Sequence, residues 1–270
     1  MDQLFFFYSC LFNYVIKNIM QDIYIGDVGK GFPLVLVHGF LGTSKMWEPQ
    51  VNFFKDYFRV ITPDIPGFGK SKKIKSLDKI QSVANLLLEH LKKKQIDKFH
   101  LLGHSMGGMI VQEMAKIDSN KIAKLVCYST GPRGEMPGRF ETVDQSRENL
   151  KKKGLNFTAE SIAKTWFVKG KDAKYFNLCC EEGKKTTIES ADNSLIAFKH
   201  WNGVDTLKDI KNETLIIWGD QDKSYNIDQI QTLKKNILNS SLVIFKNCAH
   251  NVHLEKIDEF NRKIYEFLIR

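Results

Sequence analysis

Ser105 lies between two glycines, Gly103 and Gly107, where an apolar run, residues 99–102, gives way to a helix-forming stretch, residues 109–115. This layout is typical of a nucleophile elbow, a sharp strand-to-helix turn that strains the serine backbone and exposes its hydroxyl. Larger side chains two residues on either side would collide in so tight a turn, which explains the glycines. A helix that starts at the serine also points free N–H groups at any oxyanion formed there. The pattern predicts a nucleophilic serine.

A serine is a weak nucleophile unless a base takes its proton and an acid holds that base in the right tautomer. Two candidate acids, Asp220 and Asp222, follow the apolar run 214–218, and His250 follows the apolar run 242–245. An acid and a histidine are therefore expected at the carboxyl ends of two later strands. The chain order serine, acid, histidine belongs to one known fold of serine hydrolases.

The elements that must position these residues alternate along the chain. Short runs rich in β-branched residues are followed by longer helical stretches, and most runs are apolar on both faces, as parallel strands covered by helices must be. The alternation predicts an α/β protein with a doubly wound, mostly parallel sheet. The expected strands are 33–37, 58–62, 99–102, 124–128, 214–218 and 241–245, with a first strand within 21–27. The clearest expected helices are 77–94, with Ser76 as its N-cap, and 258–268.

The alternation breaks once, between residues 132 and 209, which contain helical patches and no clear strand signal. An insertion of this kind predicts a helical cap over the carboxyl ends of the sheet, where ligands of open α/β sheets bind. The predicted organisation is a core of residues 20–131 and 210–270 and a cap of residues 132–209. The helical patches are 141–152, 159–167 and 192–201.

Residues 1–19 form an apolar N-terminal extension. The stretch 4–16 is too short to span a bilayer, which needs about 20 residues, and no basic residue precedes it as in a secretory signal. Three interpretations are ranked: an upstream extension of a true start at Met20, a packed or swapped apolar arm, and a membrane anchor. We expect no stable membrane anchor.

Composition and charge limit the classes of binding partner that the sequence suggests. The net charge of +9 comes mostly from lysines spread along the chain, in short clusters without interleaved aromatic residues. This pattern favours solvated surface over a nucleic-acid site. Five cysteines form no C-x-x-C pair, which argues against a disulfide framework or a zinc site and indicates a reducing, cytoplasmic location. No metal or cofactor is expected, and the oligomeric state is not predicted.

From residue 20 onward the chain resembles the α/β-hydrolase superfamily, in its compact lid-bearing branch. The resemblance implies the fold described above, with a lid inserted after a core strand. It also implies a hydrolytic enzyme without a cofactor. The motifs that carry it are His38-Gly39-Phe40-Leu41-Gly42, residues 64–71 (DIPGFGKS), residues 103–108 (GHSMGG), residues 218–222 (WGDQD) and Ala249-His250.

The resemblance assigns roles residue by residue. It makes Ser105 the nucleophile and His250 the general base and then general acid. It selects Asp222 as the acid that orients His250, because the family's acid lies three residues beyond the glycine that ends the strand. The backbone N–H groups of Phe40 and Met106 correspond to the family's oxyanion hole.

Other polar residues near these motifs receive supporting roles. His38 is interpreted as a structural histidine under the oxyanion loop, and His104 as a residue that packs or hydrogen-bonds behind the elbow. Asp220 is interpreted as a turn residue. His253, the rival base, is interpreted as a supporting or surface residue because it lies farther from the strand end.

A serine nucleophile favours acyl chemistry, in which an acyl-enzyme forms and water then releases it. The predicted function is hydrolysis of a small carboxylic ester or related acyl compound. Carbon–carbon bond hydrolysis is the alternative, because residues 247–270 resemble the meta-cleavage-product hydrolases that split dienoic diketo acids. A non-catalytic ligand-binding receptor on the same fold is the second alternative.

The sequence leaves the substrate-binding residues open. Arg133, Arg139 or a lysine could hold a substrate carboxylate. Aromatic residues of the lid could line an acyl pocket or form the lid core. They are Phe140, Phe157, Trp166, Phe167, Tyr175, Phe176, Phe198 and Trp201.

Overall fold

The protein is built on one twisted sheet, seen in a computed structural model that describes residues 22–135 and 137–270. Seven described strands lie in the order β1-β3-β2-β4-β5-β6-β7, and all neighbours are parallel except β1, which runs antiparallel to β3. The predicted α/β class and mostly parallel sheet are confirmed. The strands are β1 Ile25–Val28, β2 Pro33–Val37, β3 Arg59–Pro63, β4 Phe99–His104, β5 Ile122–Tyr128, β6 Glu213–Gly219 and β7 Ser240–Phe245.

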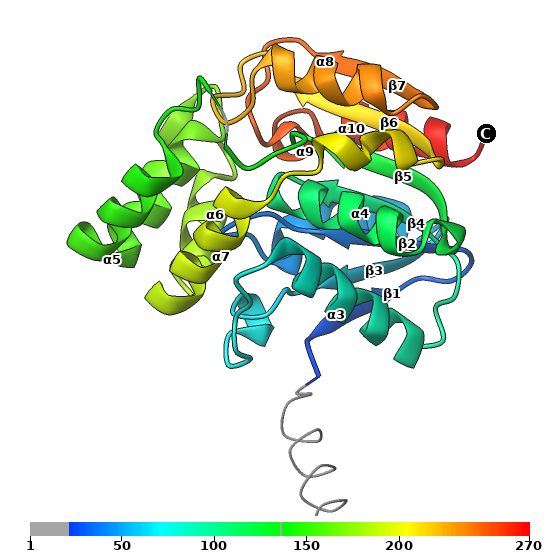
Figure 1. Ribbon diagram of the computed structural model, residues 1–270, viewed down its shortest axis with the longest axis horizontal. Helices are drawn as coiled ribbons and strands as arrows, with labels where there is room; N and C mark the ends of the chain where they lie inside the picture. The colour runs from blue at the N-terminus through cyan, green and yellow to red at the C-terminus, as the bar shows by residue number, and fades with distance from the viewer. Residues whose placement is uncertain (1–21, 136) are drawn as a thin grey trace, which may run out of the picture.

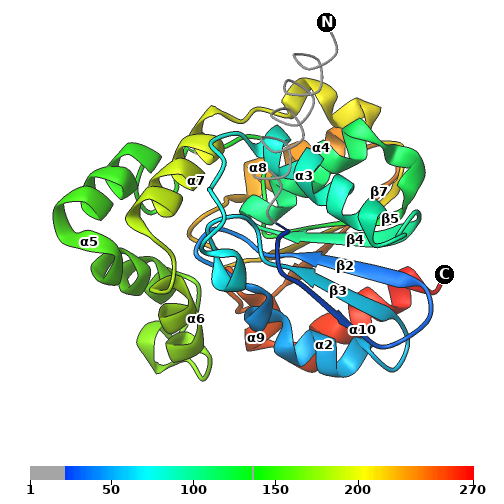
Figure 2. The same cartoon turned by 90° about the horizontal axis from the view of Figure 1, so that it is seen from below.

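Helices cover both faces of the sheet (Figure 2). On one face lie α3 Ile80–Lys93, α4 Met106–Ile117 and α8 Ile227–Asn236. On the other lie α2 Glu48–Phe54 and α10 Ile257–Leu268, with the short helix α9 Val252–Glu255 next to α10. In the described residues, no helix is both long and apolar enough to cross a membrane. Short 3₁₀ turns occur at Ser44–Trp47, Gly69–Ser71, Ser119–Lys121, Gly170–Asp172 and Val204–Asp209.

The alternation of side chains along each strand explains the two helical layers. In β2, Leu34 and Leu36 pack into the cluster that contains α10, whereas Val35 and Val37 pack into the cluster that contains α3 and α4. All four side chains are fully buried. A strand with both faces covered must be apolar at every position, and this is the pattern in the sequence.

Three helices between β5 and β6 stand beside the sheet, beyond its two faces (Figure 1). They are α5 Val143–Thr165, α6 Phe176–Gly183 and α7 Ile188–His200. The predicted patches 141–152 and 159–167 both fall on α5, whose path breaks at Gly154 (φ 78°, ψ 175°). Thr142 and Gln145 form a capping box at its start. Helix α6 was not predicted.

The serine before α3 has a different hydrogen-bond role from the predicted one. Ser76 does not cap α3: the helix begins at Ile80, its N-cap is Lys79, and the Ser76 hydroxyl accepts a hydrogen bond from Asn193 of α7 (2.9 Å). The hydroxyl is therefore used to bind the inserted helices to the core. The predicted extension 1–19 lies outside the described residues.

Candidate active site

Ser105 sits at the turn from β4 into α4. Its backbone is strained, with φ 56° and ψ −120°, as the sequence pattern predicts for an elbow. A Cβ at Gly103 would lie 2.2 Å from the Gly107 carbonyl oxygen, so only glycine fits there. Thr130 supports the turn from the next strand by donating to the Ser105 carbonyl oxygen (2.8 Å).

His250 and Asp222 form a buried pair. His250 Nδ1–H donates to Asp222 Oδ2 at 2.9 Å, and their side chains are 2% and 0% exposed. The other carboxylate oxygen, Oδ1, accepts the backbone N–H groups of Ser224 (2.7 Å) and Tyr225 (3.3 Å). The carboxylate is thus fixed by its own turn, and it fixes the imidazole tautomer that leaves Nε2 free to accept a proton.

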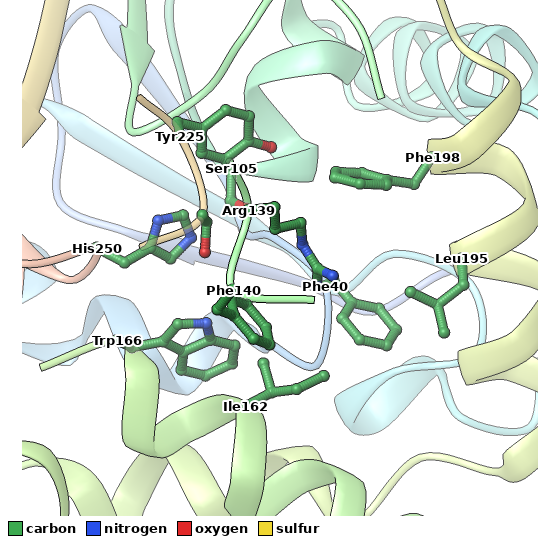
Figure 3. Close-up of a pocket in the computed structure, with 11 residues that line it drawn as sticks. Phe40, Ser105, Arg139, Phe140, Ile162, Trp166, Leu195, Phe198, Tyr225 and His250 are labelled. Carbon is green, nitrogen blue, oxygen red and sulfur yellow. The ribbon is translucent and has the colours of Figure 1, made fainter. Parts of the chain in front are cut away.

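Ser105 and His250 line the same pocket (Figure 3). In the described chain, Ser105 Oγ forms no hydrogen bond with the His250 ring, so the structure brings two of the three predicted catalytic residues into direct contact. Hydrogen bonds of this kind are often loose in unliganded enzymes and tighten when substrate binds. The Tyr225 ring stacks on the His250 ring, with centroids 5.8 Å apart and planes 11° apart.

The rival acid and base have other partners. Asp220 Oδ1 accepts the Asn247 N–H (2.8 Å), which joins two loops at the strand ends. His253 is buried, not on the surface, and its Nδ1 lies 2.9 Å from Tyr128 Oη. Burial and the nearby His250 lower the pKa of His253 to about 3, so it is neutral at physiological pH.

Two further histidines support the loops around Ser105. His104 Nε2–H donates to the His250 carbonyl oxygen (3.2 Å), and burial holds the pKa of His104 well below its usual value. His38 Nε2 accepts the Ile65 N–H (3.0 Å), while its Nδ1–H donates to the Gly39 carbonyl oxygen (2.9 Å). Both contacts match the positions that sequence reasoning expects for these side chains.

The predicted oxyanion residues lie on either side of Ser105. Met106 is the first residue of α4, where backbone N–H groups have no partner within the helix. Phe40 follows β2 and lines the pocket. The loop before it packs directly on the elbow, since a Cβ at Gly39 would lie 2.9 Å from Ser105 Cβ. The two N–H groups therefore lie in neighbouring segments that follow the carboxyl ends of β2 and β4.

The pocket is narrow, with a cavity volume of about 30 Å³. Its cap-side wall comes from Ile162 on α5, Trp166 at the end of α5, and Leu195 and Phe198 on α7 (Figure 3). Three of the eight aromatic candidates named from the sequence line the pocket, Phe140, Trp166 and Phe198, whereas Ile162 and Leu195 were not named. The full lining is Phe40, Ser105, Arg139, Phe140, Ile162, Trp166, Leu195, Phe198, Ser224, Tyr225 and His250.

Of the candidate arginines, Arg139 lines the pocket and Arg133 does not. Arg133 is exposed and forms an isolated β-bridge with Asn202. Tyr225 was not named from the sequence, because nothing in its spacing marks it except that it comes three residues after Asp222. Within residues 22–135 and 137–270, no group of three or more His, Cys, Asp or Glu side chains is arranged to hold a metal ion.

A mostly parallel sheet with a strained serine at one strand end, and a buried acid–histidine pair at two later strand ends, defines the class of α/β hydrolases. Residues 33–257 match the family model described as alpha/beta hydrolase fold, and the chain belongs to this family. The predicted superfamily and the predicted hydrolytic enzyme are confirmed.

The chain is similar to several individual hydrolases. The chain is 28% identical over 253 residues to the pimeloyl-[acyl-carrier protein] methyl ester esterase of Legionella pneumophila, covering 92% of this chain and 100% of the relative. It is 30% identical over 276 residues to the 2-hydroxy-6-oxononadienedioate/2-hydroxy-6-oxononatrienedioate hydrolase 1 of Pseudomonas putida, covering 92% of each. An esterase from Exiguobacterium antarcticum has the same fold, with a TM-score of 0.86 at 22% identity and coverage of 92% and 96%.

Proposed function

We propose that the protein is a serine hydrolase of small carboxylic esters or related acyl compounds. The observation that carries this proposal is the buried His250–Asp222 pair, which shares one pocket with a strained Ser105. The apolar wall of that pocket suits an acyl chain. An esterase among the relatives, that of L. pneumophila, agrees with this choice.

The reaction has two halves. In the first, His250 Nε2 takes the Ser105 hydroxyl proton as Oγ attacks the ester carbonyl carbon, and the carbonyl oxygen becomes an oxyanion. The N–H groups of Phe40 and Met106 hold that oxyanion, and a donor of this kind contributes about 3–4 kcal/mol to transition-state stability. The intermediate then breaks its bond to the leaving alkoxide, which takes the proton from His250, and an acyl-enzyme remains.

In the second half, water gives its proton to His250 and its oxygen attacks the acyl carbon. A second oxyanion collapses, Ser105 Oγ leaves and regains the proton, and the carboxylic acid departs. Asp222 stays ionised throughout and stabilises the imidazolium. Helices α5–α7 act in this scheme as a cap, residues 132–209, that selects the acyl group.

The test compares the purified wild-type protein with the Ser105→Ala variant in the hydrolysis of p-nitrophenyl acetate and p-nitrophenyl butyrate. We expect turnover by the wild type and a loss of about 10³-fold or more in the variant. Covalent labelling of wild-type protein by a fluorophosphonate, absent in Ser105→Ala, would exclude a purely ligand-binding receptor. Equal activity in both proteins would contradict the proposal.

Carbon–carbon bond hydrolysis is the second candidate, and the 30% identity to the P. putida dienedioate hydrolase favours it. That chemistry would use the same serine and histidine on a dienoic diketo acid. If the protein turns over such a compound and hydrolyses neither p-nitrophenyl ester, carbon–carbon bond hydrolysis would replace ester hydrolysis as the proposed function.

A further inference from the structure

Arg139 brings a positive charge to the wall of the pocket that Ser105 and His250 line. Its Nη1 donates to the Glu141 carbonyl oxygen (2.6 Å) and to Ser146 Oγ (3.1 Å). Its Nε is buried and has no hydrogen-bond partner in the described chain. Nη1 of the guanidinium is thus bound within the protein, whereas the Nε–H donor has no partner.

The charge of Arg139 also lacks a counter-ion among the described residues. The nearest acidic side chain in its turn is Glu141, whose Oε1 accepts Ser146 Oγ (2.5 Å) and whose Oε2 accepts Asn149 Nδ2 (3.0 Å). No ion pair joins Glu141 to Arg139. Burial lowers the pKa of Arg139, an effect that the charge of Glu141 opposes. Arg139 is partly buried and its charge has no ion-pair partner, so an anion that enters the pocket would be bound favourably.

The other buried polar group of the pocket lies at its Ser105 end. Tyr225 is 1% exposed, and hydrogen bonding to the Ser105 and Thr130 side chains opposes the rise that burial causes in the pKa of its hydroxyl. Arg139, from the segment after β5, is the cationic side chain of the pocket lining (Figure 3). The remaining wall is largely apolar. Its apolar members are Phe40, Phe140, Ile162, Trp166, Leu195 and Phe198.

The Arg139 side chain is also held at a fixed orientation. Its guanidinium carbon lies 4.3 Å from the centroid of the Phe140 ring, a cation–π contact, and its Nη1 is tied to residues at the start of α5. A guanidinium that is fixed in place and missing one partner is suited to bind a carboxylate oxygen.

We propose that Arg139 binds a carboxylate carried by the substrate itself. The substrate class is then an ester that has a free carboxylate beyond an apolar spacer, such as a half-ester of a dicarboxylic acid. This inference rests on the proposed ester hydrolysis and adds the chemical nature of the acyl group.

The first experiment compares two esters that differ in the group at the far end. The wild-type kcat/KM is measured for monoethyl adipate and for ethyl hexanoate, and then for the corresponding succinate and suberate pairs. Because a charge-assisted hydrogen bond in a buried site is strong, we expect the half-ester to be preferred by about 10- to 100-fold at the best chain length.

Variants separate binding of the carboxylate from the structural use of Nη1. Arg139→Gln is expected to lower kcat/KM for the half-ester far more than for the neutral ester, so that the preference disappears, and Arg139→Lys is expected to keep part of the preference. Arg133→Gln is the matched control, because Arg133 is exposed and outside the pocket lining. A purely structural role would lower both rates together and leave their ratio unchanged.

A measurement on the wild type alone covers the case in which Arg139→Gln does not fold. Free adipate should inhibit ethyl hexanoate hydrolysis competitively, and 1,6-hexanediol should not. Equal inhibition by both, or no half-ester preference in a wild type whose ester hydrolysis still depends on Ser105, would overturn the carboxylate site and leave the proposed function standing. Ester hydrolysis that does not depend on Ser105 would contradict both the carboxylate site and the proposed function.

Discussion

The two carboxylates that follow β6 are separated by one residue and bind different groups. Asp222 Oδ2 lies 2.9 Å from His250 Nδ1 in a fully buried pair. Asp220 accepts the Asn247 N–H at 2.8 Å and lies 3.7 Å from the exposed Lys246 ammonium. The two aspartates therefore make a matched pair for testing which one serves the base.

Asp222→Asn is expected to lower kcat by about 10³- to 10⁴-fold, because an amide in place of the carboxylate no longer holds the His250 tautomer that frees Nε2. Asp220→Asn should leave kcat close to that of the wild type, since the asparagine oxygen can still accept the Asn247 N–H. Steady-state hydrolysis of p-nitrophenyl butyrate measures both. A large loss in Asp220→Asn beside a small one in Asp222→Asn would reverse the assignment.

Residue-level prediction depends on how strictly the chemistry fixes a residue type. Ser105 and His250 could be named because few side chains can serve as nucleophile and base and because strand ends limit where they occur, whereas the choice of Asp222 over Asp220 depended on the family resemblance. Arg139 was one of several possible cations, and only the fold shows that it turns inward while Arg133 stays exposed. Tyr225 was missed because its place depends on the folded turn after β6. Its N–H donates to Asp222 in that turn, and its ring then stacks on the His250 ring.

At the scale of elements, the loop between β7 and α9 is bound to the segment that follows α5. Glu255 joins the two: its Oε2 accepts the Ala249 N–H (2.7 Å) and its Oε1 accepts the Val168 N–H (2.8 Å). The Asn251 N–H also donates to the Trp166 carbonyl oxygen (3.0 Å). The loop that carries His250 is thus positioned by the segment after α5 as well as by the sheet.

Glu255→Gln should loosen this connection. The amide nitrogen cannot accept a hydrogen bond, so either Ala249 or Val168 loses its partner, at a cost of about 1–3 kcal/mol in the free energy of unfolding. Displacement of the neighbouring His250 should lower kcat by about 10- to 100-fold. Urea unfolding and steady-state kinetics measure the two effects.

The control for this prediction is Glu259→Gln, because the Glu259 side chain is 45% exposed and pairs with Lys256 on the surface at 3.6 Å. It should change neither quantity appreciably. A Glu255→Gln protein that is less stable but has an unchanged kcat would show that Glu255 stabilises the loop without positioning the base.

Element-level prediction succeeded where burial imposes a clear pattern. The six strands named from apolar runs are present within one or two residues at each end, because the inner strands are covered on both faces. The edge strand β7 keeps the pattern although only Phe245 in it is buried. The inserted region was harder. Helix α5 was expected as two patches because Gly154 interrupts its pattern, and α6 was missed because it is short and packs against the other inserted helices. Such helices are stabilised by a few contacts with one another and with loops of the core, which leave no regular pattern in the sequence.

At the scale of the whole molecule, several histidines are buried without charge. Burial lowers the pKa of His100 to about 4 and that of His253 to about 3, and it also lowers the pKa of His38 and His104. His100 is enclosed by aromatic rings, with the Phe32 centroid at 4.7 Å and the Phe58 centroid at 5.8 Å. The folded chain therefore resists proton uptake in several separate places.

The free energy of unfolding should consequently fall as the pH falls below about 6.5. In the window between that value and the folded-state pKa, about 4 for His100, the unfolded chain binds a proton that the folded chain does not. Each such histidine steepens the decline by up to about 1.4 kcal/mol per pH unit. His100→Gln removes one titrating group. The free energy of unfolding of this variant should therefore fall less steeply between pH 6 and pH 5, by the slope that corresponds to about one proton.

Urea unfolding at pH 7, 6 and 5 measures the decline, and the comparison of slopes holds even if His100→Gln is less stable at every pH. His200→Gln serves as the control, because His200 is exposed at the end of α7 and should leave the slope as it is in the wild type. Stability that rises toward pH 5, or the same slope in His100→Gln and the wild type, would show that His100 takes up its proton in the folded protein. The acid sensitivity of the fold would then have to come from the carboxylates.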